Sequence, residues 1–324
     1  MFKALAVLFS TPYKQTHMHY AAPSFNRWAS YYGKRYTASE YDYRNTIFNT
    51  NVRTIYEHNL AASLMDPPGW TMTVNKFADL TPKEFKKLYS MNYTESRSNS
   101  TFTVPISAIP AQVDWTDKGV VTPVKDQGQC GSCWAFSATG AMEGAWAISK
   151  KQLFNLSEQE LVDCSTPEGN QGCNGGLMDQ AFQYVVANKG LATDAEYPYS
   201  ATGPNACKSE TSVMTISGFK DVPANSESAL LAAIVQQPVS VAVEADESVF
   251  QFYSGGVMNS PCGTNLDHGV LAVGYGTLGG QDYYKVKNSW GADWGADGYI
   301  LLGRGKFGAK GQCGIQMDPS FPVV

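Results

Sequence analysis

The cysteine residues constrain this chain more than any other feature, because covalent cross-links fix which parts of a fold lie together. All seven cysteines lie between residues 130 and 313. An odd number of cysteines in a secreted, disulfide-forming chain leaves one thiol free. The other six allow 15 pairings, so the sequence alone does not determine the connectivity. Three bridges would indicate an oxidising compartment on the secretory route.

One cysteine lies in a segment that is typical of a nucleophilic site. Residues 127–134 read Gln-Gly-Gln-Cys-Gly-Ser-Cys-Trp, and the residues that follow, up to about Lys150, favour a helix by composition and apolar spacing. Cys133 would therefore lie at a helix N-terminus, where unpaired amides stabilise a thiolate over a thiol. With a neighbouring imidazolium, we expect an ion pair that exists before substrate arrives.

A thiol that attacks near neutral pH needs a base, and histidine is scarce in this chain. Of its four histidines only His268 lies beyond residue 58. Asn288 can hold the imidazole in its working tautomer, and Trp290, two residues on, can shield that contact from water. Cysteine, histidine and asparagine in this order form a nucleophile, a base and an orienting residue.

These motifs resemble those of the papain family of cysteine proteases, most closely its cathepsin L branch. The pattern Cys-Gly-Ser/Ala-Cys-Trp/Tyr with a distant His and Asn is the known signature of that family, and here 135 residues separate Cys133 from His268. The resemblance runs from about Trp28 to the C-terminus. It implies a cysteine endopeptidase made as a zymogen, with an α+β, papain-like two-lobe fold. A helical lobe would face a β-rich, barrel-like lobe across the active-site cleft, after a mainly helical inhibitory pro-region.

The same resemblance implies roles for individual residues. Gln127 would donate a side-chain hydrogen bond to the oxyanion, together with the backbone N–H of Cys133, and Trp290 and Trp294 would cover the contact between His268 and Asn288. The disulfides would be Cys130–Cys173, Cys164–Cys207 and Cys262–Cys313. The substrate-binding residues would be Gly131, Gly175, Gly176, Leu177, Met178, Ala242, Leu266, Asp267, Gly269, Trp290 and Asp318.

The pocket for the second residue before the cut departs from the plainest cathepsin L pattern. Small Ala242 and Gly269 leave it wide enough for Leu or Phe. Asp318, five residues beyond Cys313, stands where an Ala is common. A carboxylate there can pair with an Arg or Lys side chain, so we expect apolar and aromatic residues to be preferred and Arg to be accepted.

The chain divides into two unequal parts near residue 109. Residues 86–108 contain a polar, Ser-rich stretch that is typical of an exposed, cleavable linker. Residues 1–108 hold 12 Lys/Arg and 7 Asp/Glu, a net charge of +5, and residues 109–324 hold 12 and 22, a net charge of −10. A basic part attached to an acidic part can dock partly by charge. The alternative is that both surfaces are simply solvated.

The first part carries a helical stripe of residues at spacings of three and four, which places them on one helix face: Glu40, Arg44, Phe48, Asn51, Ile55 and Asn59. The stripe is similar to the pro-region helix motif of cathepsin L-like zymogens. A second similarity lies at Asn75, Phe77 and Asp79, with Thr73 in place of the family's Gly. We therefore expect residues 23–108 to be an inhibitory propeptide that lies in the cleft in the direction opposite to a substrate. Residues 109–324 would be the mature protease.

The N-terminal residues have the character of a short leader. Residues 1–22 include a lysine and an apolar stretch from Ala4 to Phe9, which we interpret as a signal segment, truncated in this sequence. No run approaches the roughly 18 apolar residues of a membrane span. Possible glycosylation sites at Asn92, Asn99 and Asn155 agree with a secretory route. We expect a lysosomal, vacuolar or secreted protein.

The mature part is expected to change from helices to strands along the chain. Helices are predicted over 143–151, 157–163 and 177–188, with capping-box spacing at Ser157 and Glu160. Past residue 212 we predict short β-branched and aromatic strands over 239–243, 269–276, 282–287 and 298–302.

Three alternative functions compete with the protease. Cys130 and Cys133 have the spacing of a redox dithiol, but no βαβ pattern precedes them. A zinc site would need four ligands, and no second Cys-x-x-Cys or His-x-x-x-His occurs. A non-catalytic binding protein on a protease scaffold would lack the nucleophile or base, which are both present. We expect no cofactor, no metal and no nucleic-acid partner. The expected partners are peptide and protein substrates, the chain's own propeptide and protein inhibitors of cysteine proteases, and the enzyme is expected to be a monomer.

Overall fold

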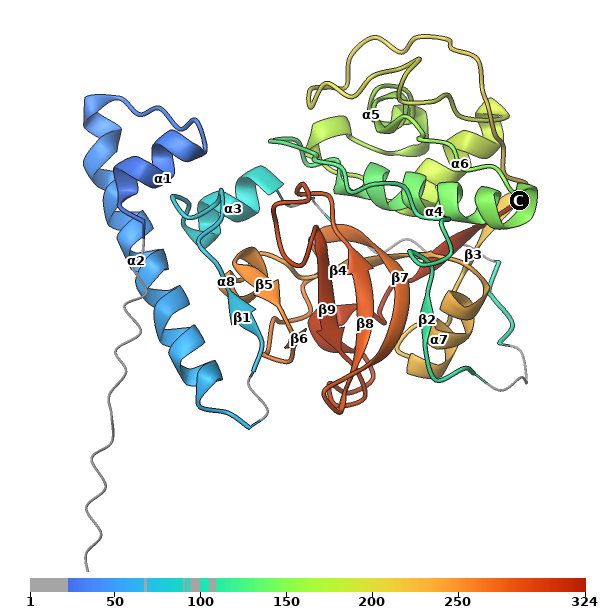
Figure 1. Cartoon of the computed structure of the whole chain (residues 1–324). Coiled ribbons are helices and arrows are strands. Elements are labelled where there is room, and N and C mark those ends of the chain that lie inside the picture. Colours follow the sequence, from blue (N-terminus) through green and yellow to red (C-terminus); the bar gives the residue numbers. More distant parts are fainter. Residues whose placement is uncertain (1–22, 67–68, 90, 92, 94–99, 105–108) are drawn as a thin grey trace, which may run out of the picture.

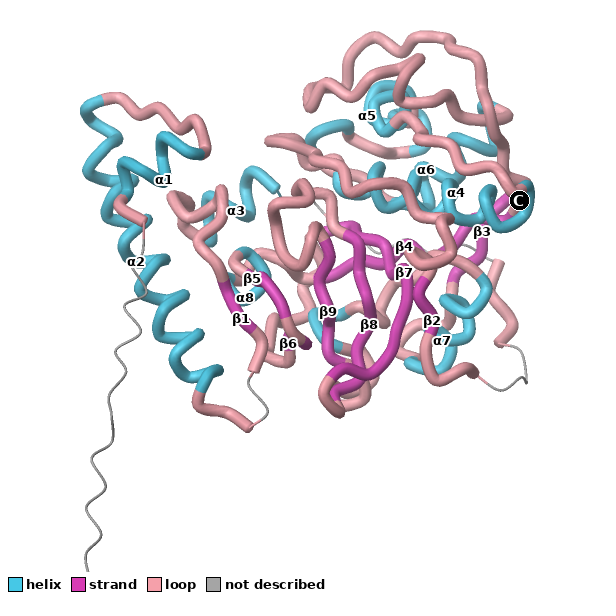
Figure 2. Tube along the Cα trace, viewed as in Figure 1, coloured by secondary structure: helices cyan, strands magenta, loops and turns pink. Residues whose placement is uncertain are grey.

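The computed structural model describes residues 23–324 except 67–68, 90, 92, 94–99 and 105–108. The expected leader, residues 1–22, and two of the glycosylation sequons, at Asn92 and Asn99, lie outside the described residues. Figures 1 and 2 show three regions: an N-terminal helical region, a β-rich lobe beside it, and a helical lobe that lies across one end of the strands. The α+β two-lobe prediction is confirmed.

The pro-region is mainly helical, as the sequence predicted. Its elements are α1 (Phe25–Tyr31), the long α2 (Ala38–Ser63), β1 (Thr71–Met72) and α3 (Pro82–Tyr89). The predicted stripe on α2 faces inward at Phe48, Asn51 and Ile55, which are all buried. The Asn51 amide donates to the carbonyls of Ala78 and Leu80, both at 2.9 Å, so the stripe fixes the chain segment that follows β1.

The two ends of the stripe, Glu40 and Asn59, make different contacts. Glu40 completes the capping box with Thr37 at the start of α2. The Asn59 side chain donates to the Met72 carbonyl and accepts from the Met72 N–H, both at 2.8 Å, which ties α2 to β1. Strand β1 pairs antiparallel with β5 (Tyr253–Gly255) of the β-rich lobe. The pro-region is therefore joined to the protease part by backbone pairing as well as by side chains.

The helical lobe is built around α4 (Cys133–Lys150). It also contains α5 (Glu158–Cys164), α6 (Met178–Asn188) and short 3-10 turns at Thr166–Glu168 and Gly172–Asn174. The three predicted helices of this lobe are present. The capping box at α5 is only half formed. Ser157 accepts from the Glu160 N–H at 3.0 Å, but the Glu160 carboxylate binds the Ala192 N–H and the Tyr184 hydroxyl instead of returning to Ser157.

The β-rich lobe contains one eight-stranded sheet whose main path runs in the order β3-β10-β4-β7-β8-β9-β6, with β2 paired to β7. Its strands are β2 (Val113–Asp114), β3 (Gly218–Asp221), β4 (Val239–Val243), β6 (Val257–Met258), β7 (His268–Leu278), β8 (Gln281–Lys287), β9 (Tyr299–Gly303) and β10 (Ser320–Val323). In the register of β4 and β7, Val243 faces His268 and Ala242 faces Gly269. The strand ends at this edge therefore carry the predicted base and pocket residues.

Two parts of the chain differ from the elements that the sequence indicated. The region beyond residue 212 is not only strands, because α7 (Glu227–Gln236), α8 (Ser248–Gln251) and a 3-10 turn at Gln312–Gly314 interrupt it. Ser226 caps α7 by accepting from the Ala229 N–H, a signal that the strand-based reading overlooked. The linker was expected from residue 86, but α3 continues to Tyr89, and Met91 and Phe102 beyond it are buried.

The buried hydrophobic side chains form two clusters. One cluster of buried side chains includes Phe48, Phe77 and Phe85 of the pro-region together with Phe250 and Trp290 of the β-rich lobe. A second cluster surrounds α4 and includes Met91 of the pro-region and Ala242 of the β-rich lobe. The pro-region thus shares buried side-chain contacts mainly with the β-rich lobe, and it reaches the second cluster through Met91.

Candidate active site

Cys133 occupies the first residue of α4 and is fully buried. Its Sγ accepts a hydrogen bond from the Gly269 N–H at 3.4 Å, which brings the start of α4 against the start of β7. The other six cysteines form the bridges Cys130–Cys173, Cys164–Cys207 and Cys262–Cys313, the pairing that the resemblance implies. Cys133 is the free thiol.

His268 is the first residue of β7, next to Gly269, and is also fully buried. Its Nε2 donates to Asn288 Oδ1 at 2.7 Å. The imidazole lies over the Trp290 indole, with ring centroids 4.6 Å apart, and Trp294 packs edge-on against Trp290 at 4.9 Å. The structure therefore brings Cys133, His268, Asn288 and their aromatic cover together from α4, β7 and the segment after β8.

The covered site favours the neutral forms of thiol and imidazole. Burial raises the pKa of Cys133 to about 12, although the backbone amides of Gly269, Trp134 and Cys133 itself act in the opposite direction. Burial lowers the pKa of His268 to about 4, against the effect of the Asn288 hydrogen bond. His268 Nδ1, the nitrogen left for Cys133, has no hydrogen-bond partner among the described residues. The expected ion pair is thus not favoured while the pro-region covers the site.

Gln127 is the predicted side-chain donor, and it is fully buried beside the site. Its Oε1 accepts from the Ser289 hydroxyl at 2.7 Å, which fixes the amide so that Nε2 faces the cleft. Nε2 donates to the Cys130 carbonyl at 2.9 Å and, at 3.5 Å, to the Tyr89 carbonyl of the pro-region. A pro-region carbonyl thus accepts from the amide group that is expected to donate to a substrate oxygen.

The pro-region continues along the cleft after Tyr89. The Met91 N–H donates to the Asp267 carbonyl at 2.7 Å, and the buried Met91 side chain belongs to the same cluster as Cys133 and Met178. Farther back along the pro-region, Phe77 and Phe85 pack edge-on against the indole of Trp290, with centroids 5.6 and 5.0 Å away. The pro-region therefore packs both in the cluster that contains Cys133 and against the indole that covers His268.

The expected pocket residues gather beside Cys133. Leu177, Met178, Ala242 and Leu266 are all buried, and the last three belong to the cluster that contains Cys133. A Cβ on Gly269 would lie 3.1 Å from Trp134 Cα and 3.2 Å from Met178 Sδ, so a larger residue would narrow the pocket.

The glycines at this wall leave little room for side chains. A Cβ on Gly176 would lie 2.3 Å from Asn170 Oδ1, so glycine is required there. Gly131 is buried and donates its N–H to the Cys173 carbonyl at 2.9 Å. Gly175 has φ of +120°, a conformation that favours glycine. These glycines fix the backbone beside the cleft.

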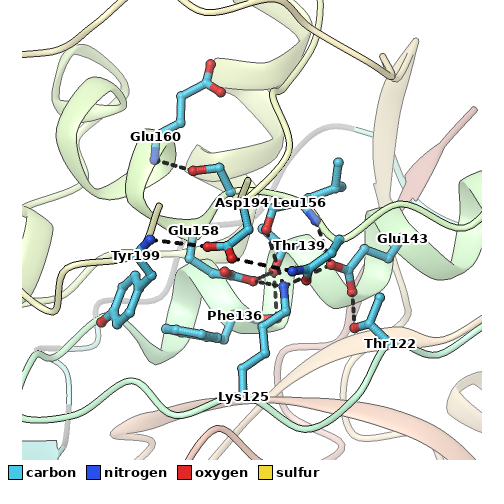
Figure 3. Close-up of polar contacts among 12 residues, drawn as sticks. Thr122, Lys125, Phe136, Thr139, Glu143, Leu156, Glu158, Glu160, Asp194 and Tyr199 are labelled. Atoms are coloured by element: carbon cyan, nitrogen blue, oxygen red, sulfur yellow. Dashed lines mark hydrogen bonds and ion pairs between the residues drawn. The ribbon is translucent and has the colours of Figure 1, made fainter. Parts of the chain in front are cut away.

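Lys125, Glu143 and Glu158 form a buried ionic cluster in the helical lobe (Figure 3). Lys125 Nζ contacts Glu143 at 3.0 Å and Glu158 at 2.5 Å. Burial opposes the charge on Lys125, but the two carboxylates together hold its pKa above the ordinary value. Lys287, next to Asn288 in the chain, donates to the Thr122 hydroxyl at 2.9 Å, and burial lowers its pKa to about 8. The cluster joins α4, which begins with Cys133, to α5 and to the end of β8, which Asn288 follows.

One group of carboxylates has the spacing of a metal site. Ligand atoms of Glu244, Asp246 and Glu247 lie within 4.8 Å of one another. Lys86 of α3 reaches this group, with Nζ 2.6 Å from Asp246 Oδ2. An ammonium group from the pro-region therefore neutralises part of the charge.

Within the described residues, no helix combines the length and the apolar character that crossing a membrane requires.

Sequence reasoning missed some contributors to the site. Ser289 holds the Gln127 amide, and the Tyr199 hydroxyl donates to the Gln127 carbonyl at 2.8 Å and contacts the Ser132 hydroxyl at 2.6 Å. Phe250 packs against Trp290 at 5.7 Å. Ser289 lies between two predicted site residues, which was a usable signal. Tyr199 and Phe250 come from distant segments, so no local sequence signal pointed to them.

Two sequence profiles match the chain. The profile described as "Papain family cysteine protease" matches residues 109–323, and that described as "Cathepsin propeptide inhibitor domain (I29)" matches residues 25–85. Among curated relatives, the senescence-specific cysteine protease SAG39 of Oryza sativa subsp. japonica is 46% identical over 315 residues, which cover 94% of this chain and 90% of the relative.

Solved proenzyme structures have the same fold. A recombinant stem bromelain precursor superposes with a TM-score of 0.85 at 40% identity, covering 93% of this chain and 97% of the other. Digestive procathepsin L 3 of the Tenebrio molitor larval midgut superposes with a TM-score of 0.84 at 39% identity, covering 92% and 97%. The similarity therefore extends over the helical N-terminal region as well as the two lobes.

Proposed function

The chain belongs to the papain family of cysteine proteases, with a propeptide inhibitor domain ahead of the protease domain, and from this premise we propose which residues carry its activity. It is a cysteine endopeptidase made as a zymogen. The proposed catalytic residues are Cys133, His268, Asn288 and Gln127. One observation carries the proposal. The Cys133 sulfur contacts the amide of Gly269, and the adjacent His268 is held by Asn288 at 2.7 Å.

In the proposed mechanism, the propeptide first leaves and water returns to the cleft. Solvation then favours the thiolate of Cys133 and the imidazolium of His268 over the neutral pair. The thiolate attacks the peptide carbonyl carbon, a C–S bond forms, and the carbonyl oxygen becomes an oxyanion. The Gln127 amide and the Cys133 N–H donate hydrogen bonds to that oxygen.

The remaining steps return the enzyme to its starting state. The imidazolium gives its proton to the leaving nitrogen as the C–N bond breaks, which leaves a thioester between Cys133 and the acyl group. His268 then takes a proton from water, and the resulting hydroxide attacks the thioester. The acid product leaves and the thiolate returns. Asn288 keeps the ring oriented during both proton transfers, and Trp290 keeps water from that hydrogen bond.

We propose that residues 23–108 are the propeptide and residues 109–324 the mature enzyme. Ile109 is 38% exposed, which supports cleavage just before it. The path of the pro-region, from Tyr89 beside Gln127 to Met91 beside Asp267, supports a direction opposite to that of a substrate. Intramolecular inhibition then follows from occupation of the cleft by a segment that presents its peptide bonds in the wrong direction.

We propose the substrate-binding assignment as well. Residues Gly131, Gly175, Gly176, Asp267 and Trp290 would contact an extended peptide, and Leu177, Met178, Ala242, Leu266, Gly269 and Asp318 would form the pocket for the second residue before the cut. The partly buried Asp318 carboxylate supports acceptance of Arg beside apolar and aromatic residues. Reporter peptides ending in Phe-Arg and Arg-Arg test this, because Asp318→Ala should lower the rate for Arg-Arg relative to Phe-Arg.

The setting of the enzyme is also a proposal. Three disulfides and the exposed Asn155, the first residue of a sequon, support passage through the secretory route to a lysosome, a vacuole or the exterior. The partners would be peptide and protein substrates and protein inhibitors of cysteine proteases, and the enzyme would act as a monomer without a cofactor.

A single experiment tests the zymogen and the nucleophile together. The purified chain is acidified under reducing conditions, and peptide hydrolysis and mass are followed in parallel with the Cys133→Ala chain. New activity should accompany loss of residues up to about 108 in the unaltered chain, and Cys133→Ala should show no activity. Hydrolysis by Cys133→Ala at the same rate would contradict the assignment of the nucleophile.

A further inference from the structure

A tyrosine of the pro-region lies in the pocket proposed for the second residue before the cut. Tyr93 packs against the buried cluster that contains Met178, Ala242 and Leu266, the proposed pocket walls. Met91, two residues earlier, is buried in the same cluster. The pro-region therefore presents an aromatic ring at the place where a substrate side chain would bind.

The hydroxyl of this tyrosine has a specific partner. Tyr93 Oη donates a hydrogen bond to Asp318 Oδ2 at the floor of the pocket. A hydrogen bond from a neutral hydroxyl to a carboxylate is stronger than one between two neutral groups. Asp318 therefore distinguishes a phenol from a plain phenyl ring.

The backbone is anchored on both sides of Tyr93. Before it, the Met91 N–H donates to the Asp267 carbonyl at 2.7 Å. After it, the Phe102 N–H donates to the Asp221 carbonyl at 2.7 Å, and the Asp221 N–H donates to the Ser100 carbonyl at 2.9 Å. The protease part thus holds the pro-region at Met91, two residues before Tyr93, and again at Ser100 and Phe102.

The acceptor oxygen of Asp318 favours an occupant that donates a hydrogen bond. Asp179 of α6 and Asp221 of β3 lie near enough to act on one another. The pKa of Asp179 rises to about 8, first through burial and then through the charges of Asp221 and Asp318. Asp179 is therefore mostly protonated and neutral in acid, and Asp318 Oδ2 is the acceptor to which Tyr93 donates. A tyrosine hydroxyl or an arginine meets this demand, and a phenylalanine does not.

We propose that the mature enzyme selects tyrosine over phenylalanine as the second residue before the cut, with Asp318 as the specificity-determining residue. This inference rests on the proposed peptidase function and on the pocket assignment. The propeptide uses the same contact to hold itself in the cleft, so Tyr93 stands in for the side chain that the enzyme prefers. Sites that hydrogen-bond a substrate hydroxyl discriminate against analogues that lack it.

The test measures kcat/KM of the mature enzyme for three reporter peptides that differ only in the second residue before the cut: Tyr, Phe and Arg. The pocket is partly open to water, so the expected Tyr-to-Phe ratio is roughly 3 to 10 in the unaltered enzyme. In Asp318→Ala the ratio should fall to about 1, because nothing remains to accept the hydroxyl proton.

Asp318→Asn is the matched control for charge, because it keeps the shape of the side chain and an accepting oxygen. We expect it to retain part of the preference for Tyr and to lose most of the rate with Arg. This variant also keeps the test decisive if the Ala variant folds poorly. A ratio at or below 1 in the unaltered enzyme, or a ratio that is the same in all three proteins, would overturn the inference.

The outcomes separate this inference from the proposed function. Hydrolysis of the Phe reporter without a preference for Tyr overturns only the selectivity of Asp318. No hydrolysis of any reporter overturns the proposed peptidase function, and the inference with it.

A second measurement uses the whole zymogen. Tyr93→Phe removes the hydroxyl that binds Asp318, so propeptide release at a fixed acidic pH should be roughly threefold faster than in the unaltered chain. Tyr56→Phe on α2 is the control, because Tyr56 is 49% exposed. Equal rates for all three chains would overturn the claim that the contact helps to hold the propeptide.

Discussion

The imidazole of His268 stacks on the indole of Trp290, with ring centroids 4.6 Å apart and ring planes 26° apart. The same indole makes edge-on contacts with the rings of Phe77, Phe85 and Tyr89 of the pro-region. One side chain thus belongs both to the proposed catalytic group and to the docking surface of the inhibitor. Removal of the propeptide therefore changes the surroundings of the base directly.

Phe85→Ala should weaken docking of the propeptide strongly. Phe85 is fully buried and packs against Phe77, Tyr89 and Trp290. Removing a buried phenylalanine side chain costs about 3–5 kcal/mol. We expect a lower unfolding midpoint in the Cys133→Ala zymogen and faster activation in the chain with Cys133 present. Tyr31→Ala, at a position that is 81% exposed, is the control and should change neither quantity.

Two interactions across the same boundary should contribute unequally. The Asn75 side chain is buried, donates to the Gln251 carbonyl at 2.7 Å and accepts from the Phe77 N–H at 3.0 Å. Lys86 pairs with Asp246 at 2.6 Å, but its side chain is 51% exposed. Asn75→Ala should therefore cost about 1–3 kcal/mol, and Lys86→Met less than about 1 kcal/mol.

The salt dependence of activation distinguishes the Lys86 ion pair from the Asn75 hydrogen bonds. Added NaCl should reduce the effect of Lys86→Met on the activation rate and leave that of Asn75→Ala nearly unchanged, because exposed charges are screened. A larger effect for Lys86→Met than for Asn75→Ala at ordinary salt would show that docking depends mainly on charge, as the opposite net charges of the two parts suggest.

The thiol of the intact zymogen should react slowly. Burial holds the pKa of Cys133 at about 12, so the reactive thiolate is scarce at pH 6. Iodoacetamide should label the intact chain much more slowly than the processed enzyme at that pH. Cys133 is the free cysteine, so labelling can be followed by mass alone. Equal rates before and after processing would contradict this account.

His268 should make the zymogen less stable in acid. Its pKa is about 4 when folded and buried, below the ordinary value of 6.5. Between these values the unfolded chain binds the extra proton, so this contribution to stability is present above pH 6.5 and is lost as the pH falls towards 4. The full loss is ~3 kcal/mol.

Unfolding of Cys133→Ala with and without His268→Asn, measured from pH 7 to pH 4, checks this contribution. The neighbouring Asp267 has a pKa raised to about 7 by burial, which acts with the opposite sign. Because Asp267 is present in both chains, the difference between them isolates His268. Parallel stability curves would rule out the assigned role of His268 in acid destabilisation.

Lys125→Met should destabilise the protein by about 3–5 kcal/mol, because it leaves Glu143 and Glu158 buried without their cation. The loss should be larger at pH 8 than at pH 5, since acid can protonate the unpaired carboxylates. Lys306→Met, at an exposed position, is the control. Chemical unfolding at the two pH values gives the comparison, and equal losses at both would contradict the prediction.

The sequence carried enough to place the proposed catalytic residues and the helices α2, α4, α5 and α6. Cys133 could be placed at a helix start because its motif precedes a long apolar-periodic run, and α4 begins there. The stripe on α2 was predictable because helical spacing puts its residues on one face. Local patterns of this kind depend on neighbours in the chain, so a single sequence contains them.

Other features depended on contacts between distant segments. Glu160 has capping-box spacing, but Tyr184 and Ala192 from other parts of the helical lobe take its carboxylate. Helix α7 lies in a region whose β-branched residues suggested strands, and its buried side chains pack into the core of the β-rich lobe. For Glu160, tertiary partners outweighed the local preference, whereas α7 carries a local signal, the Ser226 cap, that the strand prediction overlooked.

By itself the sequence determined the order of nucleophile, base and orienting residue, the division into a pro-region and a protease, and the residue types at the pocket. Only the tertiary structure decided that the thiol and imidazole are held in surroundings that favour their neutral forms, and that Tyr93 binds Asp318. The physical reason is that charge state and recognition depend on burial and on the exact neighbours of each group. Those neighbours come from segments far apart in the chain, which are brought together only when the pro-region and the two lobes pack.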